Sequence, residues 1–461
     1  MQIFKDPKIV KLIETLRDEI KGTAFENHVF VVGGSVRDSI LGLPVKDIDL
    51  VVNMKNGGVL LATYLTMRFK CHIPSKNPVL YNNYGTARFQ LYSNSELKDI
   101  EIECVQTRRE QYHCDSRNPS VLFGTLEEDA KRRDLTINSL LYNITTDKVH
   151  DYNNGIDDIV KKVIKTPSDP NIIFNEDPLR ILRTIRFACK LGWDIEKNTW
   201  LGMVKNAHRI DIISQERITD EISKILKTEK PSIGFRKMYA CGLLNRILPD
   251  IYDLTTSFEY GKMTLFDHTL NVMDAVKPNV PNRLAALFHD VSKTLSKDIS
   301  FRNVNIEDFS SSVAAHDLVM MKYPNNIVRA VEVAIKYHRY FSDYTDKTLP
   351  PDKKIRKFIN LTNEHLDVVF DLMNANNTYC GRGKKKKQVL NILNRIEELG
   401  NIEESKNVKL PVNGSDIIKK FKMKPCPTIG IILNKIKEAY FENPNITEDE
   451  CYEIARNIIG K

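Results

Sequence analysis

The sequence predicts an α+β fold, with a small mixed sheet near the N-terminus and helices over the rest of the chain. Two observations support this prediction. Up to about residue 150, short runs rich in β-branched residues alternate with helical stretches. From about residue 171 onward, apolar residues recur at helical spacing. At 461 residues, the chain is long enough for about three domains.

The elements of the N-terminal part follow from this alternation. His28–Val32 is a short apolar run that ends at two glycines, which indicates a buried strand before a turn. Further strands are expected at 47–52, 86–91 and 100–105, and helices at 35–41 and 57–69. Farther along, helices are expected at 178–191 and 214–227, the second with Ser214 as its cap.

Composition narrows the class of protein. Apolar residues make up 42% and charged residues 28%, which excludes a disordered, collagen-like or small disulfide-stapled chain. The eight cysteines form no C-x-x-C pair, so we expect free thiols and no cysteine zinc site. No apolar run reaches the ~18 residues of a membrane span and no signal-peptide pattern is present, so we expect a cytoplasmic protein without a membrane partner. The net charge of +8 permits a polyanionic partner without requiring one.

Gly33, Gly34 and Ser35 lie between the first strand and the following helix. Small residues there let backbone N–H groups approach an anion, and the helix N-terminus adds partial positive charge. Arg37, in the first helical turn, can hold phosphate oxygens. A tight turn also favours glycine, so this motif alone is weak evidence for a phosphate site.

Asp47 and Asp49 stand two residues apart on a predicted strand, so their carboxylates share one face. Close carboxylates repel each other, and binding Mg²⁺ with a substrate phosphate is the function such a pair suits. The alternative, an exposed strand with a polar face, is weakened by the apolar residues around the pair. Glu101 and Glu103 repeat the spacing on a later strand. A third carboxylate would complete a two-metal site for nucleotidyl transfer, and we expect Glu103 to supply it while Glu101 faces solvent.

A further motif carries several polar side chains. Asp129-x-x-Arg132-Arg133-Asp134-x-x-x-Asn138 is expected on one helix, where Asp134 and Asn138 lie one turn apart, as do Asp129 and Arg133. Such a polar stripe of donors and acceptors suits ribose hydroxyls and a triphosphate. The alternative is a solvated helix with intrahelical ion pairs.

Asp177 precedes Pro178 at the start of a predicted helix, so it can serve as an N-cap. It can also pair with Arg180 on the same turn to read a base edge. A carboxylate accepts from an exocyclic amine and a guanidinium donates to a ring acceptor, which favours cytosine and adenine over uracil and guanine.

In this order and spacing, the motifs resemble the class II CCA-adding enzymes and their poly(A) polymerase relatives, within the polymerase-β-like nucleotidyltransferases. The resemblance rests on five segments: Gly33–Asp38, Asp47–Asp49, Arg132–Asn138, Asp151–Asp158 and Glu176–Arg180. Glu216-Arg217 with Glu221 also resembles the family's neck helix. Any one segment is a moderate signal, whereas the ordered set is strong.

The resemblance implies a role for each residue. Asp47 and Asp49 would hold two Mg²⁺ ions, with Glu103 as the third catalytic carboxylate. The expected nucleotide-binding residues are Gly33, Gly34, Ser35, Arg37, Arg132, Asp134, Asn138, Asp177 and Arg180. The substrates would be CTP and ATP, and the partner would be the acceptor arm of tRNA. Four domains are implied: a nucleotidyltransferase head (1–150), a helical neck with the base-recognition motif (151–255), a helical HD-like body (256–400) and a helical tail (401–461).

The HD-like body resembles a phosphohydrolase domain whose metal ligands are a lone histidine, a His-Asp pair and a later aspartate. His268, His289 and Asp290 match the first three, and His338 also stands where relatives have a histidine. The last ligand is replaced by Asn376, and an amide oxygen is a poor substitute for a carboxylate. The alternative is a hydrogen-bonded polar cluster inside a structural domain.

Three details of the second half stay open in the sequence. His316 could compensate for a serine-rich segment that replaces a histidine-rich one in relatives, and Asp371 could be the missing ligand. The lysine run 384–387 is a candidate RNA contact, although such a run is more often a solvated surface.

The expected function is template-independent addition of C and A to the 3′ end of tRNA. A poly(A) polymerase, or an enzyme adding only CC or only A, would share the same head and neck. Two different classes remain as alternatives: a metal-dependent phosphohydrolase acting through the HD-like domain, and a catalytically silent RNA-binding protein.

Overall fold

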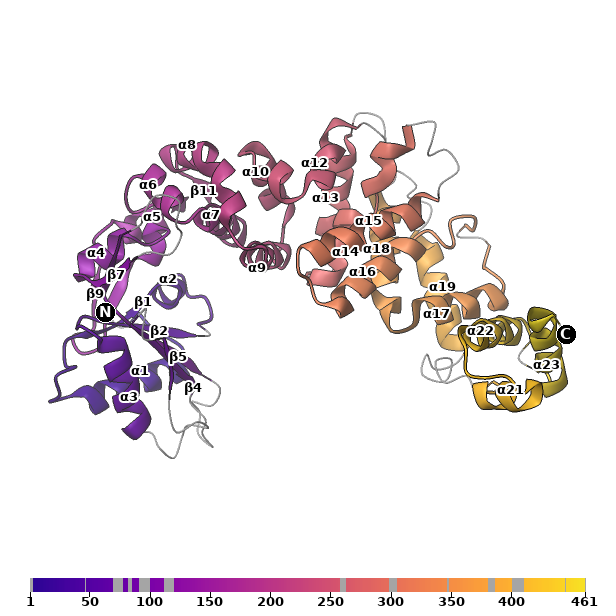
Figure 1. The fold of residues 1–461 in the computed structure, drawn as a ribbon. Coiled ribbons are helices and arrows are strands. Elements are labelled where there is room, and N and C mark those ends of the chain that lie inside the picture. Colours follow the sequence, from indigo (N-terminus) through magenta and orange to yellow (C-terminus); the bar gives the residue numbers. More distant parts are fainter. Residues whose placement is uncertain are drawn as a thin grey trace. The chain divides into compact units, whose positions relative to one another are not determined.

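The computed structural model describes residues 3–45, 47–68, 78–81, 85–90, 100–111, 120–257, 263–297, 305–345, 348–379, 386–399, 410–443 and 445–460. The chain divides into two compact units, Met1–Ile247 and Leu248–Lys461. The first contains a mixed sheet with helices and the second is helical in the residues described, which confirms the predicted α+β fold (Figure 1). The finer division into four domains stays a prediction. Within the described ranges, no helix combines the length and apolar character needed to cross a membrane.

A seven-stranded mixed sheet organises the first unit. Its strands lie in the order β3 (Val79–Tyr81), β4 (Thr86–Gln90), β5 (Glu101–Gln106), β2 (Ile48–Val52), β1 (Val29–Val32), β8 (Leu141–Asn143) and β9 (Lys148–His150). Strands β2 and β5 run parallel, and the other neighbours are antiparallel. All four expected strands of this sheet are present, each end shifted by at most one residue. Strands β3, β8 and β9 were not predicted, because three residues carry too little alternation to be recognised.

The two faces of this sheet are covered differently. Alternate side chains such as Ile48 and Leu50 face the larger core, which is covered by α1 (Pro7–Ile20) and α3 (Gly57–Arg68). The opposite face carries a smaller apolar cluster beside α4 (Leu126–Lys131), made of Phe30, Val32, Val51, Ala130 and Leu141. Asp49 has the same parity as Val51, so its side chain belongs to this second face.

The expected single helix over Asp129–Asn138 is wrong. Helix α4 ends at Lys131, and a 3₁₀ turn, η2, covers Thr136–Asn138. Between them Leu135 is extended, with φ −138° and ψ 148°. The carboxylate of Asp134 accepts the backbone N–H of Leu135 at 2.9 Å, and such local side-chain bonds compete with helical hydrogen bonding.

Helices follow the sheet to the end of the first unit. They are α5 (Gly155–Lys161), α6 (Pro170–Glu176), α7 (Leu179–Leu191), α8 (Lys197–Asn206), α9 (Gln215–Leu226), α10 (Ser232–Ala240) and α11 (Leu244–Ile247). Helix α2 (Gly34–Ile40) and the short strand pairs β6 (Arg108–Gln111) with β7 (Ser120–Phe123) and β10 (Val163–Ile164) with β11 (Asp194–Ile195) complete it. Helix α7 buries the predicted apolar face and ends at Gly192, whose φ of 67° favours glycine.

The described residues of the second unit contain these α-helices: α12 (Pro249–Asp253), α13 (Leu265–Ala275), α14 (Val280–Phe288), α15 (Ile306–Met320), α16 (Asn325–Tyr337), α17 (Asp352–Thr362), α18 (Leu366–Tyr379), α19 (Lys386–Glu398), α21 (Gly414–Phe421), α22 (Pro427–Glu442) and α23 (Glu448–Ile459). The last three share a small core of their own. Of the lysine run 384–387, the first two residues lie outside the described residues.

Candidate active site

The strands β2 and β5 bring the predicted catalytic carboxylates together. Asp49 and Glu103 are register partners on these parallel strands, so their side chains leave the sheet side by side on one face. Asp47 precedes the strand and is exposed, whereas Asp49 is partly buried. Glu101 lies two residues before Glu103 and therefore projects from the same face.

The electrostatics of Asp49 reflect this crowding. Burial first, and then the negative charges of Glu103, Asp47 and Glu101, raise the pKa of Asp49 from 3.8 to about 6. The positive charge of Arg133 acts in the opposite direction without outweighing these effects. Burial and neighbouring negative charge thus dominate at Asp49. Anionic oxygens gathered in this way are the ligands that Mg²⁺ prefers, so the residues fit the predicted ion.

The Gly-Gly-Ser turn lies against this cluster. Gly33 has φ 76° and ψ −133°, a conformation that favours glycine, and Gly34 begins helix α2. A Cβ at Gly33 would lie 3.9 Å from Oδ2 of Asp49, which shows how close the turn passes. The hydroxyl of Ser35 donates to the backbone carbonyl of Asp47 at 2.9 Å. The turn is therefore tied to the strand that carries the carboxylates.

Three of the predicted nucleotide-binding residues belong to a buried hydrogen-bond chain. Arg37 is 3% exposed, and its guanidinium donates to Asp38 at 2.8 Å and to Asn138. Asn138 donates to Asp134 at 3.0 Å, and Asp134 accepts from Arg183 of α7 at 2.8 Å. Burial alone would raise the pKa of Asp134, but Arg183 and Asn138 outweigh it and lower the pKa to about 2. This chain connects the Gly-Gly-Ser turn to helix α7, and the nucleotide contacts of its members stay predictions.

Asp129 forms ion pairs with the two adjacent arginines of its motif, Arg132 and Arg133. This fully buried carboxylate accepts from Arg132 at 2.6 Å and from Arg133 at 2.9 Å. Burial would raise the pKa of Asp129, and the two arginines together lower it instead. Arg132 also donates to the carbonyl of Arg108 at 3.1 Å.

Arg133, which was not among the predicted site residues, lies at the carboxylate cluster. A Cβ at Gly33 would be 3.8 Å from Nη1 of Arg133, and the charge of Arg133 acts on Asp49. The two adjacent arginines in the sequence indicated that Arg132 or Arg133 would lie at the site. The structure shows that Arg133 is the one near Gly33 and Asp49.

Asp177 and Arg180 lie on one turn, as predicted. Asp177 accepts the backbone N–H of Leu179 at 3.2 Å, although the N-cap of α7 is Pro178, and its other oxygen accepts from Arg217 at 2.9 Å. Arg180 donates to the carbonyl of Ile173 at 3.2 Å and to Glu176 at 3.1 Å. Neighbouring groups therefore hold both side chains, and reading of a base by this pair stays a prediction.

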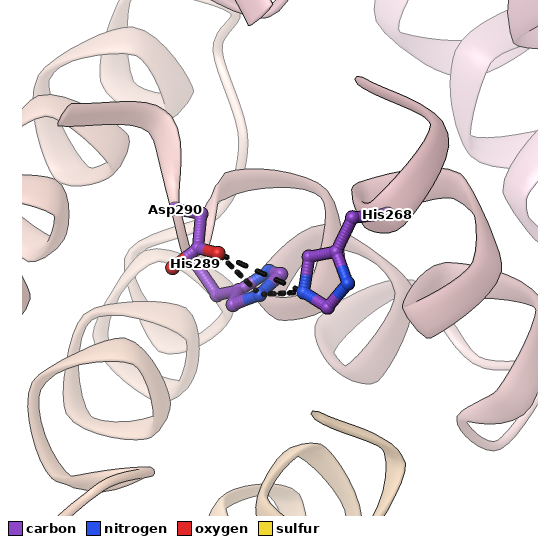
Figure 2. Close-up of side chains that lie close together, drawn as sticks. All are labelled: His268, His289 and Asp290. Carbon is purple, nitrogen blue, oxygen red and sulfur yellow. Dashed lines mark hydrogen bonds and ion pairs between the residues drawn. The ribbon is translucent and has the colours of Figure 1, made fainter. Parts of the chain in front are cut away.

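The predicted second metal site is assembled in the other unit. Figure 2 shows His268, from α13, pointing toward His289 and Asp290, which follow α14. The Nε2 atoms of the two histidines are 3.3 Å apart, and Oδ2 of Asp290 is 3.2 Å from His289 and 3.7 Å from His268. All three side chains are buried, and their potential ligand atoms lie within 4.8 Å of one another.

Two further side chains that the sequence left open as ligands, His316 and Asp371, have other partners. His316 is 75% exposed and contacts Asp317, so it does not complete the cluster. Asp371 accepts the backbone N–H of Lys277 at 2.8 Å and the amide of Asn282 instead of facing the histidines. His316 lies on α15, and Asp371 lies on α18 beside the start of α14.

Comparisons with known proteins show the family of the chain. Two family models match the chain: the poly A polymerase head domain over residues 29–165, and the probable RNA and SrmB-binding site of polymerase A over residues 192–254. The chain is 30% identical to the multifunctional CCA protein of Methylobacillus flagellatus, over 68% of this chain and 74% of that protein. It is 28% identical to the mitochondrial CCA tRNA nucleotidyltransferase of Candida glabrata, over 93% and 90% of the two chains.

The fold matches a crystal structure of the Bacillus stearothermophilus CCA-adding enzyme in complex with CTP. The TM-score is 0.66 at 20% sequence identity, with 99% of each chain covered. The predicted family and the predicted enzyme class are confirmed by these matches. The chain belongs to the family of CCA-adding tRNA nucleotidyltransferases.

Proposed function

We propose that this chain adds C and A to the 3′ end of tRNA, using CTP and ATP and releasing pyrophosphate. The observation that carries the proposal is the meeting of Asp49 and Glu103 with the Gly33 turn and Arg133 on one face of the sheet. Solved CCA-adding enzymes have been obtained with CTP, with ATP and with tRNA, which supports these substrates and this partner.

Asp47, Asp49 and Glu103 would hold the Mg²⁺ ions. When bound, Mg²⁺ activates the RNA 3′-hydroxyl and neutralises charge on the departing pyrophosphate. The chain itself supplies Arg133, whose guanidinium is fixed by Asp129 and adds positive charge where the triphosphate meets the carboxylates. The Gly33 turn keeps side chains away from this point.

Selection of the base would fall to Asp177 and Arg180. The carboxylate accepts from the amine of cytosine or adenine and the guanidinium donates to the adjacent ring acceptor, so no nucleic-acid template is needed. The bonds to Arg217 and Glu176 hold these two side chains before the nucleotide arrives.

Primer extension tests this function. A tRNA lacking CCA, tRNAs ending in C or CC, and an unstructured RNA are incubated with Mg²⁺ and CTP, ATP or both, and the ends are sequenced. We expect addition that stops after CCA on tRNA alone. Long A tails on every RNA would indicate a poly(A) polymerase, and addition of only CC or only A would indicate half of a split pathway.

The compartment is tested separately. The sequence predicts a cytoplasmic protein, whereas the Candida glabrata relative is mitochondrial by name. Imaging of a fluorescent fusion in the source cell distinguishes the two locations.

We also propose that His268, His289 and Asp290 can take one divalent ion. Burial lowers the pKa of His268 to about 3, which leaves its imidazole neutral and able to ligate. His338 lies beside them, with ring centroids 5.5 Å apart from His289, and its buried Nε2 has no hydrogen-bond partner among the described residues. The ammonium of Lys293, however, lies 2.7 Å from Asp290 and competes with a metal ion for this carboxylate.

Replacing Lys293 should therefore strengthen metal binding. We expect Lys293→Ala to raise the affinity for Co²⁺ or Zn²⁺ by about tenfold, since one competing positive charge is removed. Cobalt absorption spectra and calorimetric titration measure this, with Lys293→Ala/His289→Ala as the control that loses the gain. Equal measurable affinities with and without Lys293 would contradict its role as a competitor. No binding to either protein would show that the cluster is a metal-free structural feature.

A further inference from the structure

We propose that Arg88 is a positioning residue for the catalytic carboxylates. By holding Glu101, it leaves Glu103 as the third carboxylate beside Asp47 and Asp49. This inference rests on the proposed function of that cluster and concerns which of two equivalent glutamates serves it.

The sheet register places Arg88 in line with the site. Arg88 of β4 is the antiparallel partner of Glu103 on β5, and Glu103 is the parallel partner of Asp49 on β2. The three side chains therefore form one row across three strands, on the same face. Glu101 is the next residue of β5 on that face, and its own partner on β4 is Gln90.

Arg88 hydrogen-bonds Glu101, which lies diagonally across from it on β5. Its Nε donates to Oε1 of Glu101 and its Nη2 donates to Oε2, so both carboxylate oxygens are engaged. A bidentate arginine–carboxylate pair fixes the direction of the glutamate as well as its charge. The expectation that Glu101 simply faces solvent therefore has to be corrected.

The position of the Arg88–Glu101 pair indicates a role other than stabilising the fold. The Arg88 side chain is 50% exposed and that of Glu101 is 34% exposed, and such surface ion pairs contribute little to folding. Without Arg88, however, two glutamates of the same length would project two residues apart beside Asp49. Either could approach an incoming metal ion, and their mutual repulsion would spread both over several positions.

The experiment compares Arg88→Gln with Arg68→Gln. Arg68 forms a similar half-exposed pair with Glu19, at 2.6 Å, between α3 and α1. We expect Arg88→Gln to raise the Mg²⁺ concentration for half-maximal transfer by about tenfold or more, as losses in the outer shell of metal sites do. Arg68→Gln should leave this concentration unchanged. Thermal unfolding should be alike in both variants.

A second-site change separates positioning from direct contact with substrate. In Arg88→Gln/Glu101→Gln the competing carboxylate is gone, so we expect the Mg²⁺ requirement to return to within about threefold of the wild type. If the double variant stays as impaired as Arg88→Gln, or if Arg88→Gln behaves like Arg68→Gln, the inference is overturned. Loss of the proposed function itself would appear differently, as full transfer activity in a variant without Asp49.

Discussion

Asp49→Asn should abolish nucleotidyl transfer, by about a thousandfold or more, and should leave tRNA binding within about twofold of the wild type. Asp49 is the carboxylate that the others surround: it is in register with Glu103, and both Asp47 and Glu101 act on it electrostatically. An amide keeps the shape of the side chain but loses the anionic oxygen that a magnesium ion needs.

The same variant should be more stable than the wild type in the absence of metal. The pKa of Asp49 is about 6 in the folded protein against an ordinary 3.8, so the folded state loses stability as pH rises from 3.8 through 6. Asparagine removes this cost, which amounts to roughly 2–3 kcal/mol above pH 6. Below pH 3.8 both states are protonated, and the gain should disappear.

Thermal unfolding from pH 4 to 8, alongside single-nucleotide addition and filter binding of tRNA, measures these effects. Asp18→Asn, an exposed aspartate of α1, is the matched control and should change neither activity nor the unfolding profile. A more stable but inactive Asp49→Asn protein excludes misfolding as the cause of inactivity. Full activity of this variant would contradict the metal assignment.

Arg180→Ala should relax the choice among the four triphosphates. Loss of the donor to the ring acceptor of cytosine or adenine should reduce discrimination against UTP by about tenfold to a hundredfold, the usual range for one base-reading contact. Arg180 is held by Glu176 and by the carbonyl of Ile173, so it is oriented before the nucleotide binds.

Competition between CTP and UTP on a tRNA lacking CCA measures this selectivity. Lys190→Ala, near the other end of α7, is the control, because Lys190 contacts Asp38 rather than the turn that bears Arg180. Unchanged selectivity in Arg180→Ala would remove the argument that protein side chains replace a template.

Much of the site could be predicted because its residues are close in sequence or on strands of clear alternation. The spacing of Asp47 and Asp49 and the position of Gly33 after an apolar strand depend on backbone geometry alone. The break after Lys131 could not be predicted, since it depends on whether the Asp134 side chain bonds its own backbone.

The sequence by itself determined the family, the α+β fold and the candidate carboxylates of the first unit. Local periodicity and motif spacing can be recognised without knowledge of the fold. Only the tertiary structure decided where each residue of a doubled motif lies. Arg133 rather than Arg132 lies at Gly33, and Arg88 bonds Glu101 and not its register partner Glu103. These choices depend on strand order and on how a side chain turns once three strands are paired, and neither is encoded within a few residues of chain.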